Sequence, residues 1–113
     1  MPRIDIKPLS VNQAWQGQRF KTKAYKQYEK DLMLLLPNDF KVPDGDLVLL
    51  AEFGFSNRGS DWDNPVKPMQ DILQKKYGFD DNRIVSAHVR KEIVAKGEEY
   101  FSFDLESITN GEF

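Results

Sequence analysis

The stretch LVLLAEFGF, residues 47–55, decides the fold of this chain because its apolar side chains recur at every second position. Successive side chains of an extended chain point to opposite faces of a sheet. The face shared by this predicted strand consists of Leu47, Leu49, Ala51, Phe53 and Phe55. Such an apolar face has to be covered by another layer of structure.

One helix is expected before this strand in the sequence and another after it. Thr22 can cap a first helix, which Pro37 stops at about Leu36, and a second helix is expected from about Pro65 to Tyr77, with Gly78 as its C-cap. The apolar positions with helical spacing are Tyr25, Tyr28, Leu32 and Leu35 in the first helix and Val66, Met69, Leu73 and Tyr77 in the second.

The remaining segments predict three more strands. Residues 3–8 alternate and suggest a short strand, and a loop is expected over residues 9–21. Residues 83–94 and 100–107 also alternate, and the turn at 95–98 indicates that they form a hairpin. The predicted fold is α+β, with a mixed four-stranded sheet packed against two helices in the order β-α-β-α-β-β.

The composition is typical of one soluble globular domain over residues 1–113, with 40% hydrophobic and 30% charged residues. The chain has no cysteine, which excludes disulfides, thiolate catalysis and cysteine-ligated metal sites. No apolar run approaches the roughly 20 residues of a membrane span. Residues 1–10 also lack the apolar stretch of a signal peptide. A cytoplasmic protein with no membrane partner is expected.

The charge is unevenly distributed along the chain, although the net charge is only −2. Residues 1–30 hold seven lysines and arginines against two acids, whereas residues 98–113 hold five acids and no basic residue. An acidic pI argues against a nucleic-acid partner, but the basic N-terminal region leaves a local nucleic-acid-binding surface open.

The most informative polar stretch is SDWDNPVKPMQD, residues 60–71. Asp61 and Asp63 are two residues apart at the end of a strand, so their carboxylates converge and repel unless a cation lies between them. Mg²⁺ prefers such oxygen ligands, and a nearby cation such as Lys67 would balance phosphate charge during phosphodiester hydrolysis. The alternative is an ordinary helix start, in which Asn64 is the N-cap and the acids interact with the helix dipole.

A second acidic pair, Asp80-Asp81, follows the second predicted helix. A helix rises about 1.5 Å per residue and therefore carries this pair away from its own beginning. Asp81 joins Asp61 and Asp63 only if the approach of the next strand brings it back, or if it comes from a second subunit. Otherwise the pair belongs to a solvated turn.

Together these segments resemble the RusA family of Holliday junction resolvases, which is found in phages and prophages. The resemblance rests on DWDNPVKPMQDIL, residues 61–73, followed by DDNRIV, residues 80–85. They follow the family pattern of an acid, any residue and Asp-Asn, then a lysine and Asp-Ile-Leu, then Asp-Asp before a strand. PLSVN, residues 8–12, is similar to the family's opening Pro-x-Ser-x-Asn, and the resemblance covers roughly residues 4–108. Trp62 departs from the pattern, since an aliphatic residue is usual there.

The resemblance implies a RusA-like fold and a homodimeric, Mg²⁺-dependent endonuclease of DNA recombination and repair, with Mn²⁺ able to substitute. Such an enzyme would cut two strands of a four-way DNA junction symmetrically, by in-line attack of water that leaves 5′-phosphates. By the match, Asp61, Asp63 and Asp81 would be catalytic metal ligands, Lys67 the catalytic lysine, and Asn64 and Asp71 supporting residues.

A further group of residues is expected to contact the junction DNA: Asn12, Arg19, Lys21, Lys23, Lys26 and Arg58. Each phosphate contact would add to the salt dependence of binding. The alternatives are a solvated loop and helix face for the basic run, a turn-forming role for Asn12 and a polar bend at Arg58. Trp15 is a candidate for stacking on an unpaired base, but packing over the core is the simpler expectation.

Three functions stay open on the sequence: a RusA-like endonuclease, a junction-binding relative without cleavage, and an interaction domain whose acids only cap a helix. The presence of all four expected catalytic residues counts against a relative that has lost cleavage. Junction cutting that depends on metal separates the first function from the second. Stabilisation by metal separates a carboxylate site from a helix cap.

Overall fold

Residues 47–55 form an interior strand of the protein's main sheet. In a computed structural model that describes residues 1–16 and 20–108, this four-stranded sheet has the order β1-β6-β4-β5. Strand β4 (Leu47–Phe55) pairs in parallel with β5 (Ile84–Ile93) and antiparallel with β6 (Tyr100–Ser107). The five alternating side chains of β4 are all buried, as predicted.

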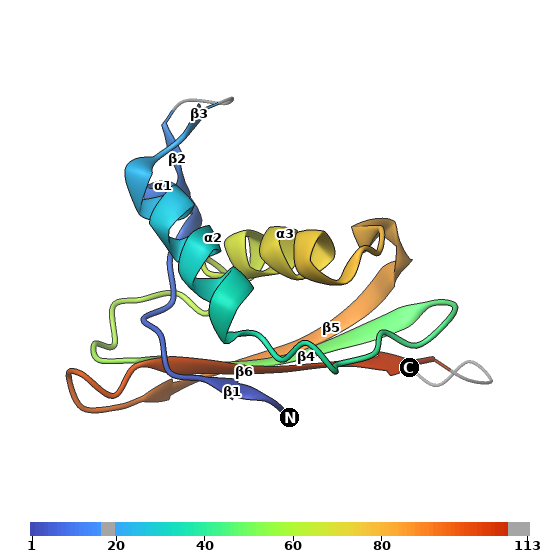
Figure 1. The fold of residues 1–113 in the computed structure, drawn as a ribbon. Coiled ribbons are helices and arrows are strands. Elements are labelled where there is room, and N and C mark those ends of the chain that lie inside the picture. The colour runs from blue at the N-terminus through green and yellow to red at the C-terminus, as the bar shows by residue number, and fades with distance from the viewer. Residues whose placement is uncertain (17–19, 109–113) are drawn as a thin grey trace.

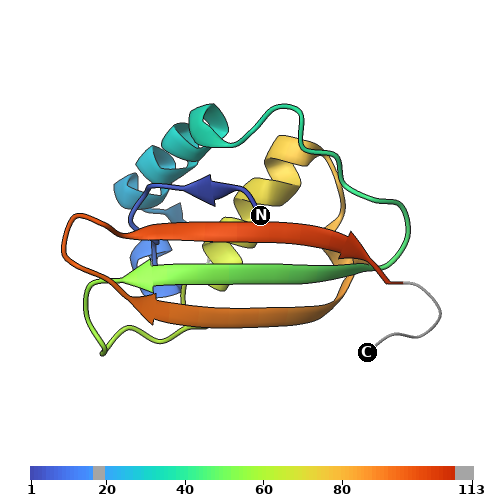
Figure 2. The same cartoon turned by 90° about the horizontal axis from the view of Figure 1, so that it is seen from below.

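Helices cover one face of this sheet. In the described part of the chain there are three: α1 (Val11–Ala14), α2 (Lys23–Leu35) and α3 (Val66–Tyr77). They all lie on the same side of the sheet, and the view from the other side shows the strands in front of them (Figures 1 and 2). This arrangement confirms the predicted α+β fold with a mixed four-stranded sheet.

The expected loop at residues 9–21 has structure of its own. It contains α1 and a ribbon of two short strands, β2 (Trp15–Gln16) and β3 (Phe20–Lys21), which projects away from the main sheet (Figure 1). The strand expected at 3–8 is shorter than predicted, since only β1 (Arg3–Ile4) of this segment is a strand, and it pairs with β6.

Local signals set the ends of the two long helices as predicted. The backbone N–H of Tyr25 donates to the Thr22 hydroxyl at 3.1 Å, which caps α2. Gly78 takes a left-handed conformation (φ 67°) at the C-cap of α3. Helix α2 ends before Pro37, as predicted. Its last buried apolar side chain is that of Leu36 and not that of Leu35, which is 52% exposed.

The predicted hairpin between the last two strands is wrong, because β4 lies between β5 and β6. The turn before β6 therefore crosses the end of β4. The inner residues of β6 are fully apolar (Phe101, Phe103 and Leu105), which suits a position inside the sheet. Strand β5 carries the exposed Ala87 and the half-buried Lys91 on its inner side, which suits an edge. A parallel neighbour also needs a crossover, and α3 provides it.

The outer face of the sheet depends on one close backbone approach. Tyr100 lies opposite Gly54 in the β4–β6 register, and its ring covers the glycine. The Tyr100 hydroxyl donates to the Glu52 carboxylate, and the Arg3 guanidinium lies 3.9 Å from the ring centroid. A Cβ atom on residue 54 would come within 2.4 Å of the tyrosine ring, so only glycine permits this packing.

We therefore expect Gly54→Ala to destabilise the protein by about 1 to 3 kcal/mol, because the Tyr100 ring has to move and loses its contacts with Glu52 and Arg3. Urea unfolding monitored by circular dichroism measures the change. The matched control is Gly54→Ala in a Tyr100→Ala background, where the cost should largely disappear. An equal cost in both backgrounds would contradict this account.

Candidate active site

Helix α3 begins directly after the two acids that follow β4. Pro65 occupies the N-cap position, and within the described residues no side chain caps the helix. The first turn is closed by backbone bonds instead, with the Val66 N–H donating to the Asp63 carbonyl at 3.2 Å. The alternative in which Asn64 is the N-cap is therefore wrong in this respect, because Pro65 takes that position.

Asp61 and Asp63 are exposed at this helix start. Neither carboxylate has a hydrogen bond or ion pair with any residue in the described part of the chain. Trp62 between them is 53% exposed, so it does not belong to the core. Both carboxylates are thus available to a ligand, and neither side chain is used to hold the local fold.

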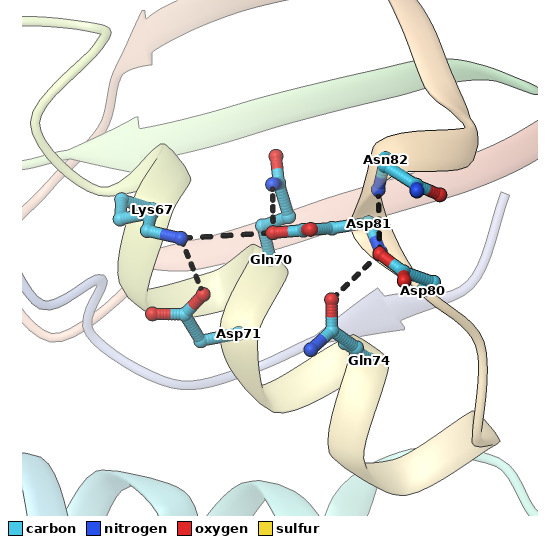
Figure 3. A network of polar contacts seen from close by, with 7 residues as sticks. All are labelled: Lys67, Gln70, Asp71, Gln74, Asp80, Asp81 and Asn82. Atoms are coloured by element: carbon cyan, nitrogen blue, oxygen red, sulfur yellow. Dashed lines mark hydrogen bonds and ion pairs between the residues drawn. The ribbon is translucent and has the colours of Figure 1, made fainter.

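Lys67, on the first turn of α3, is held between two other acids (Figure 3). Its Nζ atom lies 2.8 Å from the Asp71 carboxylate and 3.6 Å from that of Asp81. The hydrogen bond to Asp71 and the charge of Asp81 raise the pKa of Lys67 above its ordinary value. The side chain therefore stays protonated at neutral pH and provides a fixed positive charge.

The chain brings Asp81 back to α3 through a single 3-10 turn, η1 (Asp81–Arg83). Gln70 Nε2 donates to the Asp81 carboxylate at 3.1 Å, and the Asp81 N–H donates to Gln74 Oε1 at 2.7 Å (Figure 3). Asp80 initiates the turn by accepting a bond from the Asn82 N–H at 2.9 Å. Return within the same chain therefore brings Asp81 to Lys67. It does not gather Asp81 with Asp61 and Asp63 into one cluster of acids among the described residues.

Gln70 and Gln74 are site residues that the sequence analysis missed. A signal was present, because residues 67, 70 and 74 are spaced by three and four and so share one side of a helix. The side-chain amides of Gln70 and Gln74 can each donate and accept a hydrogen bond. On the same side of the helix as Lys67, they indicate a neighbouring residue that uses both. Asp81 provides this partner through its carboxylate and its backbone N–H.

The acids form two neighbouring groups along α3. Asp61 and Asp63 lie at its beginning, while Asp81 lies against its side with Lys67. Among residues 1–16 and 20–108, no three His, Cys, Asp or Glu side chains lie close enough together to hold one metal ion. The donor chemistry still suits Mg²⁺, which is commonly bound by one or two carboxylates with water and substrate phosphate completing its shell.

The N-terminal motif packs directly against the acidic loop. The Val11 N–H donates to the Asn64 carbonyl at 2.8 Å, which fixes α1 beside the beginning of α3. Ser10 and Gln13 form a capping box around α1, a pattern that the Ser-x-x-Gln spacing could have revealed. Asn12 is exposed on α1 and forms no side-chain hydrogen bond with the described site residues.

The expected DNA contacts fall on separate surfaces. Lys23 and Lys26 are exposed on the first turns of α2, while Lys21 lies 3.6 Å from Glu29. Arg58 is exposed in the loop after β4, and that loop is tied to β5 because Lys91 Nζ donates to the carbonyls of residues 58 and 60, at 3.0 and 2.6 Å. Arg19 lies outside the described residues.

Trp15 packs over the core, which confirms the simpler of the two expectations. Its ring centroid lies 5.6 Å from that of Tyr25, and the side chain is half-buried against the core. The exposed aromatic residue near the acids is therefore Trp62.

No protein-family model matches this chain, and no curated protein matches its sequence. In the described part of the chain, no helix is long and apolar enough to cross a membrane. The functional argument therefore rests on the site itself.

We expect Lys67→Met to lower the free energy of unfolding by about 0.5 to 1 kcal/mol at pH 7, because Asp71 and Asp81 then face each other without a cation. Since the folded protein raises the pKa of Lys67, this contribution is complete below the ordinary lysine pKa and is lost as the pH rises through the raised value. Urea titrations at pH 7 to 9, which is below the ordinary lysine pKa, should therefore give the same difference at every pH. Lys30→Met, at an exposed position of α2, is the matched control. Equal effects of the two substitutions would show that the ion pairs contribute nothing.

Proposed function

We propose that the protein is a RusA-like, Mg²⁺-dependent endonuclease that resolves four-way DNA junctions by paired, symmetric nicking. The observation that carries the proposal is the placement of Lys67 against Asp81, on the first turn of the helix that follows Asp61 and Asp63. These two carboxylates have no partner among the described residues. No side chain among the described residues caps α3, so the competing explanation retains only the attraction of these acids to the helix dipole.

Each group has a distinct role in the proposed reaction. Asp61, Asp63 and Asp81 are the proposed metal ligands, and bound Mg²⁺ would supply an activated water and neutralise charge on the leaving oxygen. Lys67 is protonated and placed to balance charge on the scissile phosphate. Asp71 orients Lys67 through its 2.8 Å bond, and Asn64 fixes the neighbouring N-terminal segment.

Lys67 also connects the two groups of acids. In the free protomer Asp81 accepts from Gln70 and pairs with Lys67. A DNA phosphate that attracts the lysine would leave the Asp81 carboxylate with a free lone pair. Substrate binding and completion of the ligand set are thereby coupled in this proposal.

Two symmetric cuts need two sites, so we propose a homodimer with one site in each protomer. The basic residues Lys21, Lys23 and Lys26 and the polar residues near the site, Asn12 and Arg58, are the proposed DNA contacts, together with Arg19. This activity belongs in the cytoplasm, where the DNA of a bacterial or phage-infected cell is located.

The first test is cleavage of a labelled four-way junction beside a linear duplex of the same sequence, with Mg²⁺ and with EDTA. The proposal predicts paired, ligatable nicks in the junction only, and their loss with EDTA. Asp63→Asn and Lys67→Met should each reduce the rate at least about 100-fold. Asp44→Asn, at an exposed acid in the loop before β4, should leave it unchanged. Junction binding with no cut product would identify a non-cleaving binder instead.

Metal binding has a separate readout in thermal stability. The melting temperature should rise with Mg²⁺ or Mn²⁺ concentration, since a ligand that binds only the folded state stabilises it. Asp63→Asn should melt at a higher temperature than the parent without metal, because repulsion with Asp61 is relieved, and should no longer respond to metal. A parent protein whose melting temperature is independent of both ions would rule out a carboxylate metal site.

A further inference from the structure

A pocket of about 350 Å³ lies beside Asp61, in a size range usual for ligand sites. The α1 segment forms one wall with Ser10 and Gln13, and the loop after β4 forms the other with Asn57, Ser60 and Asp61. Asn64, whose carbonyl accepts from Val11, joins the two walls. The pocket thus combines the N-terminal motif with the acidic motif, which are about 50 residues apart in the sequence.

The amide side chains of this pocket are oriented by internal bonds. Gln13 Oε1 accepts from the Ser10 backbone and hydroxyl, both at 3.3 Å, and Asn57 Oδ1 accepts from the Ser60 hydroxyl at 3.0 Å. In both cases the carbonyl oxygen is used within the protein, and the amide nitrogen has no partner among the described residues. Each wall therefore carries one oriented amide donor, and the Asp61 carboxylate adds an acceptor on the wall of Asn57.

The charge of the pocket argues against a second phosphate as its ligand. Its one cation, Lys7, is outnumbered by the carboxylates of Asp61 and Glu99. The remaining polar groups are neutral amides and hydroxyls, while Pro8 and Phe55 supply an apolar surface. A flat neutral ring with donors and acceptors along its edge matches this lining, and nucleobases have this chemistry.

We propose that this pocket receives one nucleobase of the junction, displaced from the stack next to the scissile phosphate, and reads its edge through Gln13 and Asn57. The inference rests on the proposed function, because Asp61 is both a wall of the pocket and a proposed metal ligand. Displacing a base costs least where stacking is already interrupted, as at a branch point. The pocket would therefore give cleavage a preference for particular bases at the crossover.

The test uses four-way junctions in EDTA, so that binding is measured without cutting. A single abasic nucleotide is placed in turn at each position around the crossover, and Kd is measured by fluorescence anisotropy. We expect one position at which loss of the base weakens binding about tenfold. Gln13→Ala and Asn57→Ala should weaken binding of the intact junction by a similar factor and become insensitive to the abasic site.

Gln27→Ala is the matched control, because it removes an exposed amide of α2 that bonds only to Asp31 among the described residues. It should behave as the parent protein at every position. Circular dichroism checks that each variant is folded. Asn57 is exposed in a loop, so its substitution leaves the core intact.

The outcomes separate the pocket from the nuclease. Binding that is indifferent to every abasic position, or Asn57→Ala and Gln13→Ala variants that keep the parent's dependence, would overturn the pocket even if the junction is cut with Mg²⁺. Base-dependent binding without cutting would support the pocket while the nuclease proposal fails. A protein that does not bind the junction at all would overturn both.

Discussion

Burial of the inner face of β4 is the constraint on which the rest of this structure depends. The strand has hydrogen-bonded neighbours on both sides, so its apolar face can be shielded only by a layer above the sheet. Because β5 runs parallel to β4, the chain has to return across the sheet before β5 can begin. Helix α3 makes that return and buries Met69, Ile72 and Leu73 against the sheet. The acids are therefore placed at the beginning of α3 by the topology of the core.

Electrostatics then determines what this helix can do. Its buried side stabilises the fold, while Lys67, Gln70, Asp71 and Gln74 organise the polar contacts along it. The Lys67 charge is compensated twice, by Asp71 and Asp81, whereas Asp61 and Asp63 have no compensating cation among the described residues. A bound divalent cation would complement this imbalance, and this is the physical reason for the proposed metal dependence.

The parts of the fold that depend on local signals could be predicted from the sequence. Alternation gave the bounds of β4, and the side chain of Thr22 and the backbone freedom of Gly78 gave two helix ends. Strand pairing was mispredicted because nearness in sequence favoured a hairpin, whereas the choice of neighbours depends on which strand has enough apolar surface to lie inside the sheet.

The residues of the candidate site could be named from the sequence, but most of the contacts between them could not. Lys67 and Asp81 were identified from the sequence, but their proximity depends on η1 and on Gln74, which no spacing rule connects to an acid seven residues later. The pocket beside Asp61 could not be foreseen either, because its walls come from segments that meet only through the Val11–Asn64 bond.

The two bonds from Lys91 to the loop after β4 have a consequence for communication across the molecule. Lys91 belongs to β5, the edge strand of the main sheet, and it holds the carbonyls of Arg58 and Ser60 just before the acids. Edge and acidic loop are thus joined through one side chain, so the geometry of the loop depends on where β5 lies in the sheet.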